Sequence, residues 1–133
     1  HQVWKEITEA MMQVLFVALG GAIGSVLRHL ASVWAAQRWG AEFPYGTLLV
    51  NVVGCYLIGL SMVVITERLD LHPYWRLLIV SGFLGGLTTF SSFSYETLRL
   101  LEEGLWPPLL NIATNLGLGL VATVLGLWTG RAL

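Results

Sequence analysis

Four long apolar stretches follow one another along the 133-residue chain, separated by short polar or charged segments. They run approximately over residues 12–36, 43–66, 75–101 and 105–129. A bilayer core of about 30 Å is crossed by about 20 helical residues, so each stretch is long enough to span it. The pattern predicts an all-α membrane protein whose residues 1–133 form a single four-span transmembrane domain. Because the connections are short, neighbouring helices should run antiparallel.

The composition supports a membrane location and removes several other classes of function. Of all residues, 56% are hydrophobic and 11% are charged, whereas soluble domains carry about 25% charged residues. The formal net charge of −1 offers no basic surface for nucleic acid. The single cysteine, Cys55, cannot form a disulfide framework, and no grouping of nucleophile, base or metal ligands suggests an enzyme. The first apolar stretch is long enough to remain in the bilayer, so we do not expect a cleaved signal peptide.

The third apolar stretch contains the segment GGLTTFSSFSYE, which is unusual at membrane depth. Its glycine pair, Gly85 and Gly86, costs about 2 kcal/mol of helix propensity relative to alanine. Hydroxyl groups in a membrane need partners from protein or from a water-filled cavity. The segment therefore predicts a helix that is interrupted in the middle of the membrane, beside a narrow polar path.

Three side chains near this path are candidates for binding an anion. Asn51 is alone in the second apolar stretch, and its amide either forms a hydrogen bond between helices or donates to an anion at a pore wall. Phe90 and Phe93 are three positions apart and share a helix face. Aromatic rings are positive at their edges, so this pair either packs against a neighbour or presents its edges to an anion.

Polar residues elsewhere leave alternatives open. In the fourth stretch, Thr114 lies on one helical face with Asn111 and Asn115, a stripe that either lines the path or is hydrated near the membrane surface. Glu96 closes the third stretch and is either interfacial or at a pore mouth. An unpaired arginine at the bilayer centre costs about 3 kcal/mol, so Arg28 is either a structural anchor or attracts anions into a vestibule.

Glycine spacing and charge distribution bear on assembly. Gly20 and Gly24 in the first stretch have the spacing that lets helices approach closely, and helices this rich in glycine suggest a close-packed dimer. Positive residues are divided between the two sides of the membrane, with Lys5, Arg68, Arg76 and Arg131 on one side and Arg38 and Arg99 on the other. The positive-inside rule therefore selects an orientation weakly. We expect a dual-topology homodimer, in which the chain pairs with an inverted copy of itself.

Three of these segments together closely resemble the Fluc (CrcB) family of fluoride channels. They are GAIGSVLR at 21–28, GTLLVNVVG at 46–54 and GFLGGLTTFSSFS at 82–94. The resemblance implies an inverted homodimer with two fluoride pores, to which Asn51 and the pair Phe90 and Phe93 would contribute.

The resemblance also implies further site residues and a cofactor. Ser91, Ser92 and Glu96 look like additional contacts for fluoride. The backbone carbonyls of Gly85 and Thr88 would hold a structural sodium ion between the subunits.

The function implied by the resemblance is passive export of toxic fluoride across a bacterial inner (plasma) membrane. Uncharged donors suit such a pore, because conduction requires binding that is strong enough to admit an ion and weak enough to release it. Two alternatives come from other classes. A four-span proton-coupled small multidrug transporter also forms inverted dimers but needs a carboxylate in mid-membrane, whereas Glu96 lies at the margin of its stretch. A non-conducting assembly subunit would have no use for the hydroxyl-rich segment.

Overall fold

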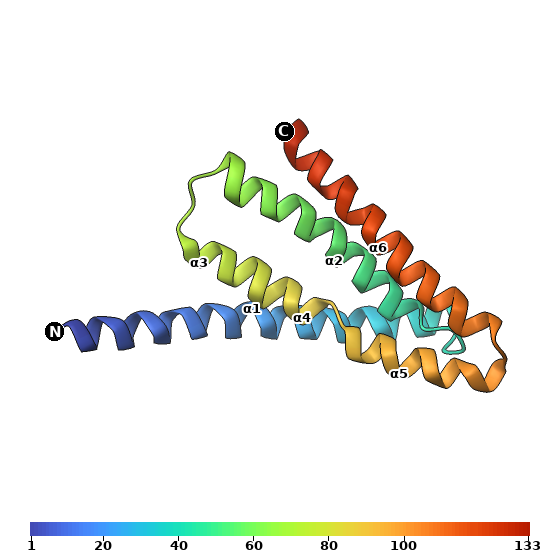
Figure 1. The fold of residues 1–133 in the computed structure, drawn as a ribbon. Coiled ribbons are helices and arrows are strands. Elements are labelled where there is room, and N and C mark those ends of the chain that lie inside the picture. The colour runs from blue at the N-terminus through green and yellow to red at the C-terminus, as the bar shows by residue number, and fades with distance from the viewer.

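The computed structural model describes residues 1–133 as a bundle of helices (Figure 1). The first helix is α1 (Gln2–Trp39), and the second is α2 (Tyr45–Val63), continued by the wider turns of η1 (Val64–Arg68). The third consists of α3 (Pro73–Arg76), η2 (Leu77–Leu84), α4 (Gly85–Leu87), α5 (Phe90–Leu100) and η3 (Leu101–Glu103), and the fourth is α6 (Trp106–Ala132). The four long apolar helices and the interruption of the third confirm the prediction from the sequence.

The helix ends follow from local sequence. Gly40 ends the first helix with φ 85°, and Gly104 separates the third from the fourth with φ 117°; both values favour glycine because it has no Cβ. At the start of the third helix, Pro73 occupies a position where its missing N–H does no harm. The imidazole Nδ1 of His72 accepts the backbone N–H of Tyr74 at 3.2 Å, which caps the same end.

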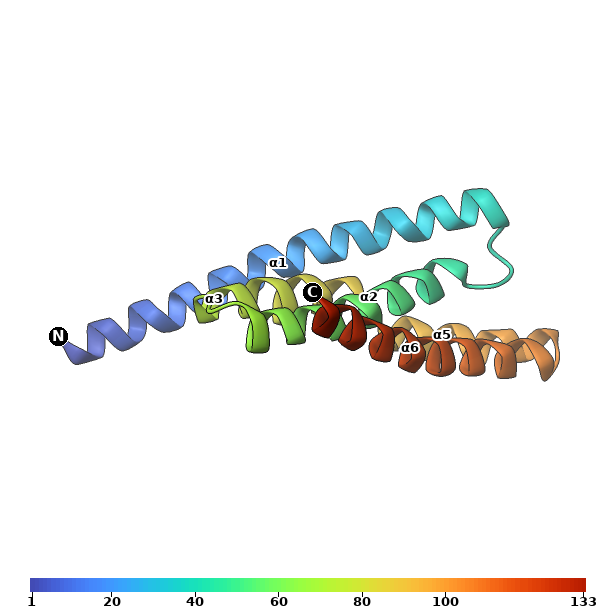
Figure 2. The same ribbon diagram turned by 90° about the horizontal axis from the view of Figure 1, so that it is seen from above.

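The helices pack in two pairs. Helix α2 lies along α6, and α1 lies along η2 and α4 (Figures 1 and 2). The amino-terminal turns of α1 extend beyond the rest of the bundle, because this helix begins at Gln2, well before the apolar stretch at residue 12 (Figure 1). Beyond the break, α5 changes direction relative to η2 and approaches the first half of α6.

Glycines make the contact between α1 and the third helix possible. A Cβ added to Gly20 would collide with the carbonyl oxygen of Leu78, and one added to Gly24 with that of Phe83. On the facing helix, a Cβ on Gly86 would lie 2.6 Å from the carbonyl oxygen of Gly21. Gly20 and Gly24 therefore serve close packing of helices inside one chain.

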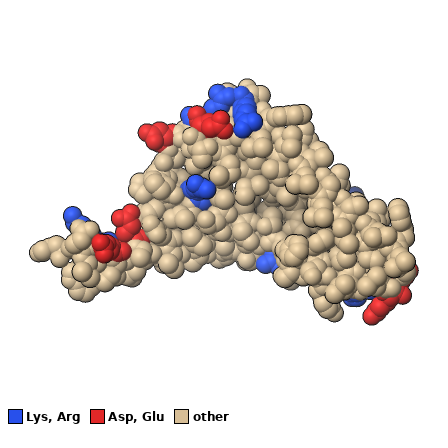
Figure 3. Space-filling model, viewed as in Figure 1, with Lys and Arg blue, Asp and Glu red and all other residues tan.

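The outer surface matches a membrane environment. Most charged side chains lie toward the extremities of the bundle, and only isolated Lys or Arg atoms appear on its broad middle, which is mainly covered by other residues (Figure 3). Four helices are long and apolar enough to cross a membrane by length and composition. Many large apolar side chains are exposed on α1 and α6, which is the expected state of a surface that faces lipid or another apolar partner.

A polar groove beside the break in the third helix

The break in the third helix lies at two threonines. Helix α4 ends at Leu87, and Thr88 (φ −86°, ψ 156°) and Thr89 (φ −150°, ψ 117°) are extended. Helix α5 then begins at Phe90, where the side chain of Thr89 accepts the backbone N–H of Ser92 at 3.2 Å. Threonine is a favoured residue at such an N-cap, so this sequence both stops one helix and starts the next.

Asn51 of α2 replaces the hydrogen bond that the break removes from the N–H of Thr89. In a continuous helix the N–H of Thr89 would donate to the carbonyl of Gly85. Here it donates to Asn51 Oδ1 at 2.8 Å, and Asn51 Nδ2 donates to the carbonyl of Thr89 at 3.1 Å. An unpaired backbone N–H inside a membrane is costly, and the amide oxygen of Asn51 satisfies it. The bond from Asn51 Nδ2 adds to the carbonyl of Thr89, which as the N-cap of α5 also accepts the first bond of that helix. Of the two roles considered for Asn51, the structure shows the hydrogen bond between helices.

From Asn51 a chain of hydrogen bonds crosses to α6 and returns to α5. Asn51 Nδ2 donates to Asn115 Oδ1 at 3.0 Å, and Asn115 Nδ2 donates to Asn111 Oδ1 at 3.0 Å. Asn111 Nδ2 donates to Thr97 Oγ1 at 2.9 Å, and Thr97 Oγ1 donates to the carbonyl of Phe93 at 2.6 Å. We call this series the amide chain. It links the hydrogen-bonded pair Asn51 and Thr89 at the break to the backbone carbonyl of Phe93.

Backbone groups fix the direction of every bond in the amide chain. At one end the N–H of Thr89 can only donate, so the atom of Asn51 that it meets must be oxygen. At the other end the carbonyl of Phe93 can only accept, so Thr97 must donate to it and accept from Asn111. Bonds that all run one way polarise one another and strengthen the series. The amide of Asn51 therefore has one orientation, with both Nδ2 hydrogens engaged inside the chain.

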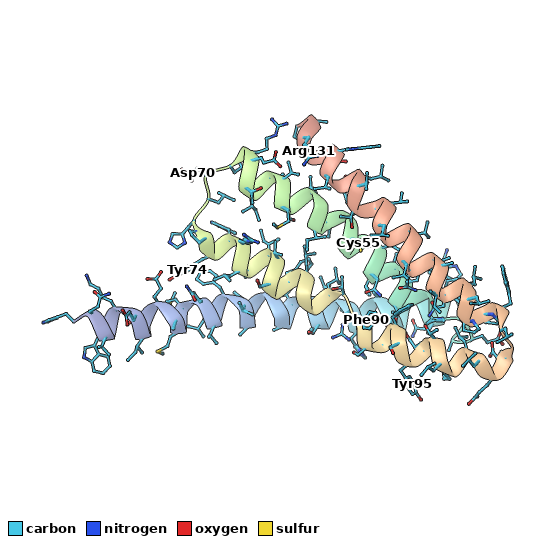
Figure 4. All side chains as sticks on the ribbon, in the orientation of Figure 1. Cys55, Asp70, Tyr74, Phe90, Tyr95 and Arg131 are labelled. Atoms are coloured by element: carbon cyan, nitrogen blue, oxygen red, sulfur yellow. The ribbon has the colours of Figure 1, made fainter.

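The break opens onto a groove of about 350 Å³. Asn51, Thr88, Thr89, Phe90, Phe93 and Asn115 line it together with Gly54, Cys55, Gly85 and several aliphatic residues, and none of the lining residues is charged. Phe90 is 76% exposed and begins α5 (Figure 4), whereas Phe93 is buried. Their ring centroids lie 5.6 Å apart with planes tilted by 50°. The structure thus brings Asn51 together with Phe90 and Phe93, which follow it by 39 and 42 positions.

A second polar hollow lies on the outer side of α5. Ser91, Ser92 and Glu96 line it together with Tyr95 and Arg99, and Thr47 of α2 donates to Glu96 Oε1 at 2.7 Å. Thr47 is buried, so the carboxylate of Glu96 is fixed to α2 on its inner side. Sequence reasoning did not single out Thr47, although a hydroxyl within an apolar stretch was a usable signal.

Two predicted residues have local roles. The hydroxyl of Thr114 donates to the carbonyl of Leu110 on its own helix at 2.8 Å, and Thr114 does not line the groove. Its neighbour Asn115 does. Arg28 Nε donates to the carbonyl of Gly86 at 2.9 Å, at the end of α4.

The carbonyl groups at the break fit the ligands of a small hard cation. Gly85 has lost its partner at the N–H of Thr89, and Gly85 is exposed and lines the groove with Thr88. A Cβ added to Gly85 would meet only the carbonyl oxygen of Val80 at 3.7 Å, so the space beside it is free. Hard cations bind oxygen ligands such as backbone carbonyls.

These features define a class: a helical protein with four apolar spans, whose interrupted third helix borders an uncharged polar groove. A family model described as CrcB-like protein, Camphor Resistance (CrcB), matches residues 15–127. The chain belongs to this family, which confirms the resemblance seen in its motifs.

Close relatives cover nearly the whole chain. The fluoride-specific ion channel FluC of Roseiflexus sp. (strain RS-1) is 50% identical over 123 residues, which are 92% of this chain and 99% of that protein. The fluoride-specific ion channel FluC of Acidobacterium capsulatum is 47% identical over 121 residues, 90% of this chain and 97% of that protein. A FluC of Solibacter usitatus is 50% identical over 121 residues, with 90% and 99% covered.

Proposed function

We propose that this protein is a passive, fluoride-selective ion channel that exports toxic fluoride across the plasma membrane of a bacterium. Membership of the CrcB-like family and close relatives named as fluoride-specific ion channels support this function. The observation that carries it in the structure is the groove beside the break, whose polar groups are all neutral. The absence of charge matters because it distinguishes a conduction path from a tight binding site.

The chemistry of the groove suits a small, strongly hydrated anion. Removing water from an ion is very costly unless other groups replace it. Amide and hydroxyl hydrogens can replace water, and the positive edges of Phe90 and Phe93 can add attraction without a full charge. An anion beside Asn51 competes with the Thr89 carbonyl and with Asn115 Oδ1 for the Nδ2 hydrogens, so the ion is held without a deep well.

We assign the remaining polar residues along the same path. Ser91, Ser92 and Glu96 form a hollow next to the groove residues of α5 and would provide the neighbouring station for the ion. In α6, Asn115 is a better candidate than Thr114, because only Asn115 lines the groove. Arg28 lies at the break, where its Nε donates to the carbonyl of Gly86.

The functional unit proposed here is a homodimer of inverted subunits with two pores. The groove and the exposed Phe90 both lie at the surface of a single chain, where a second copy can cover them. The presence of positive residues on both sides of the membrane supports insertion in both orientations. The carbonyls of Gly85 and Thr88 would hold a structural sodium ion between the subunits, which would neutralise the negative end of each broken helix.

Purified protein in liposomes loaded with potassium fluoride tests this function with a fluoride electrode. We expect rapid fluoride efflux while loaded chloride is retained; proton-coupled uptake of a cationic drug without fluoride efflux would support the multidrug transporter instead. Asn51→Asp keeps the oxygen that accepts the Thr89 N–H but replaces the donor by a second oxygen. Two negative charges about 4 Å apart repel by about 4 kcal/mol at an effective dielectric constant of 20, which is about a thousandfold in rate.

The matched control is Gln37→Glu, which makes the same chemical change at an exposed position of α1. We expect this variant to conduct like the unmodified protein. Fluoride efflux at the unmodified rate in Asn51→Asp would contradict a pore at the groove.

A further inference from the structure

Arg28 is paired with a backbone carbonyl and not with a carboxylate. Its side chain is half-buried on α1, and its Nε donates to the carbonyl oxygen of Gly86 at 2.9 Å. Side-chain ion pairing occurs elsewhere, between Arg131 and Glu67 at 3.9 Å. A guanidinium inside an apolar bundle that is bonded to one carbonyl needs an explanation.

The break supplies that explanation, because it leaves the Gly86 carbonyl without its usual partner. In a continuous helix this oxygen would accept the N–H of Phe90. The helical run from Pro73 ends at Leu87, so its last carbonyl groups lack partners within the helix. They also form the negative end of the helix dipole, where a positive side chain is stabilising.

Direct backbone contact between α1 and the third helix places Arg28 at the carboxyl end of α4. The backbone of Gly24 packs against that of Phe83, and the backbone of Gly86 packs against that of Gly21. Arg28 follows Gly24 by four positions and so lies on the same face of α1. The glycine contact sets the distance between the two helices, and Arg28 binds the Gly86 carbonyl at the end of the broken helix.

We propose that Arg28 is a positioning residue that caps the carboxyl end of the broken helix. Its Nε–H holds the Gly86 carbonyl, and it thereby fixes the adjacent carbonyls of Gly85 and Thr88 at the groove. The relevance of this position to conduction rests on the proposed channel function.

Because Arg28 bonds through Nε, substitutions at this position can separate the effect of its charge from the effect of its hydrogen bond. Nε of arginine and Nε2 of glutamine are both four bonds from Cα along the side chain. Arg28→Gln therefore keeps a donor at the bonding position and removes the charge. Arg28→Lys keeps the charge but places a methylene group there, with the ammonium one atom further out. Arg28→Met removes both, and Arg38→Met makes the same change at an exposed position near the end of α1.

The first measurement is amide hydrogen exchange in the full-length purified protein, over peptides covering residues 84–93. Loss of a hydrogen bond to a charged group corresponds to at least about tenfold faster exchange when opening is local. We expect such acceleration in Arg28→Lys and Arg28→Met, and exchange within about threefold of the unmodified protein in Arg28→Gln and Arg38→Met. The second measurement is fluoride efflux, in which Arg28→Gln should restore most of the flux that Arg28→Met loses.

Two results would overturn the proposal. Exchange in Arg28→Lys like the unmodified protein, with acceleration in Arg28→Gln, would mean that charge alone acts. Equal exchange in all variants would mean that Arg28 does not hold the break. Failure of the unmodified protein to conduct fluoride would refute the channel function, whereas the exchange data would still decide the role of Arg28.

Discussion

Replacement of Thr97 by valine tests the amide chain at the end farthest from Asn51. The hydroxyl of Thr97 accepts from Asn111 and donates to the carbonyl of Phe93. Valine has nearly the same shape and can do neither. If the chain fixes the amide of Asn51, a change at Thr97 should reach the groove although Thr97 does not line it.

The magnitude follows from burial. The side chain of Asn111 is 0% exposed, so water cannot reach the Nδ2 hydrogen that valine leaves unpaired. A buried donor without a partner costs about 1–3 kcal/mol. We expect the free energy of unfolding to fall by about 2 kcal/mol. Fluoride efflux should fall about 5- to 30-fold, about 1–2 kcal/mol of barrier, because Asn111 loses its acceptor and no longer holds Asn115 and, through it, Asn51 in place.

Thr129 of α6, bonded to Tyr56 of α2, provides a matched control. Its hydroxyl accepts from Tyr56 at 3.0 Å and donates to the carbonyl of Leu125 at 2.8 Å, so it is bonded like that of Thr97 but lies away from the groove. Thr129→Val should lower stability by about 0.5–1.5 kcal/mol and leave efflux unchanged. Thr97→Ser keeps the hydroxyl and should restore efflux.

Two assays separate the effects: denaturant unfolding in detergent for stability, and the fluoride electrode for flux. The reasoning is refuted if Thr97→Val loses stability but conducts fluoride at the unmodified rate. It is equally refuted if Thr97→Val and Thr129→Val reduce efflux to the same extent, since the loss would then reflect general destabilisation.

The remaining predictions concern the ring edges and the helix contact. Phe90 is 76% exposed in a single chain, so Phe90→Ile should leave the dimer intact on size-exclusion chromatography while fluoride efflux falls at least about tenfold, about 1.4 kcal/mol of barrier; full efflux would show that the aromatic edge is dispensable. Gly24→Ala places a methyl group against the carbonyl of Phe83, and such overpacking should lower the unfolding free energy by about 1–3 kcal/mol. Gly117→Ala, where nothing lies within 4 Å, should be neutral or stabilising by up to about 1 kcal/mol; equal loss in both variants would argue against a tight crossing.

The sequence was sufficient for the helices and for the position of the break. Apolar length predicts the helices, and the run of glycine and hydroxyl residues predicts the interruption, because both signals are local. Asn51, Phe90 and Phe93 could be chosen because polar or paired aromatic residues stand out in apolar stretches. All three line one groove, and their contact with fluoride stays a prediction.

Other features depended on contacts that no local pattern contains. Asn115 and Thr114 are neighbours on a predicted polar stripe, and only packing against α2 shows which one lines the groove. Thr97 resembles any threonine that bonds to its own helix until Asn111 is placed beside it. The partner of Arg28 is a carbonyl 58 positions away, and it is available only because the helix breaks.

The hydrogen bonds between Asn51 and Thr89 have a consequence for biogenesis. Asn51 precedes Thr89 by 38 positions, so during synthesis from the amino terminus α2 leaves the ribosome first. When the third helix enters the bilayer, Asn51 is therefore already present to accept the N–H of Thr89 and to donate to its carbonyl. Before α6 is synthesised, the nascent chain therefore already contains Asn51. This residue pairs with the backbone of Thr89 and makes the break in the third helix tolerable in lipid.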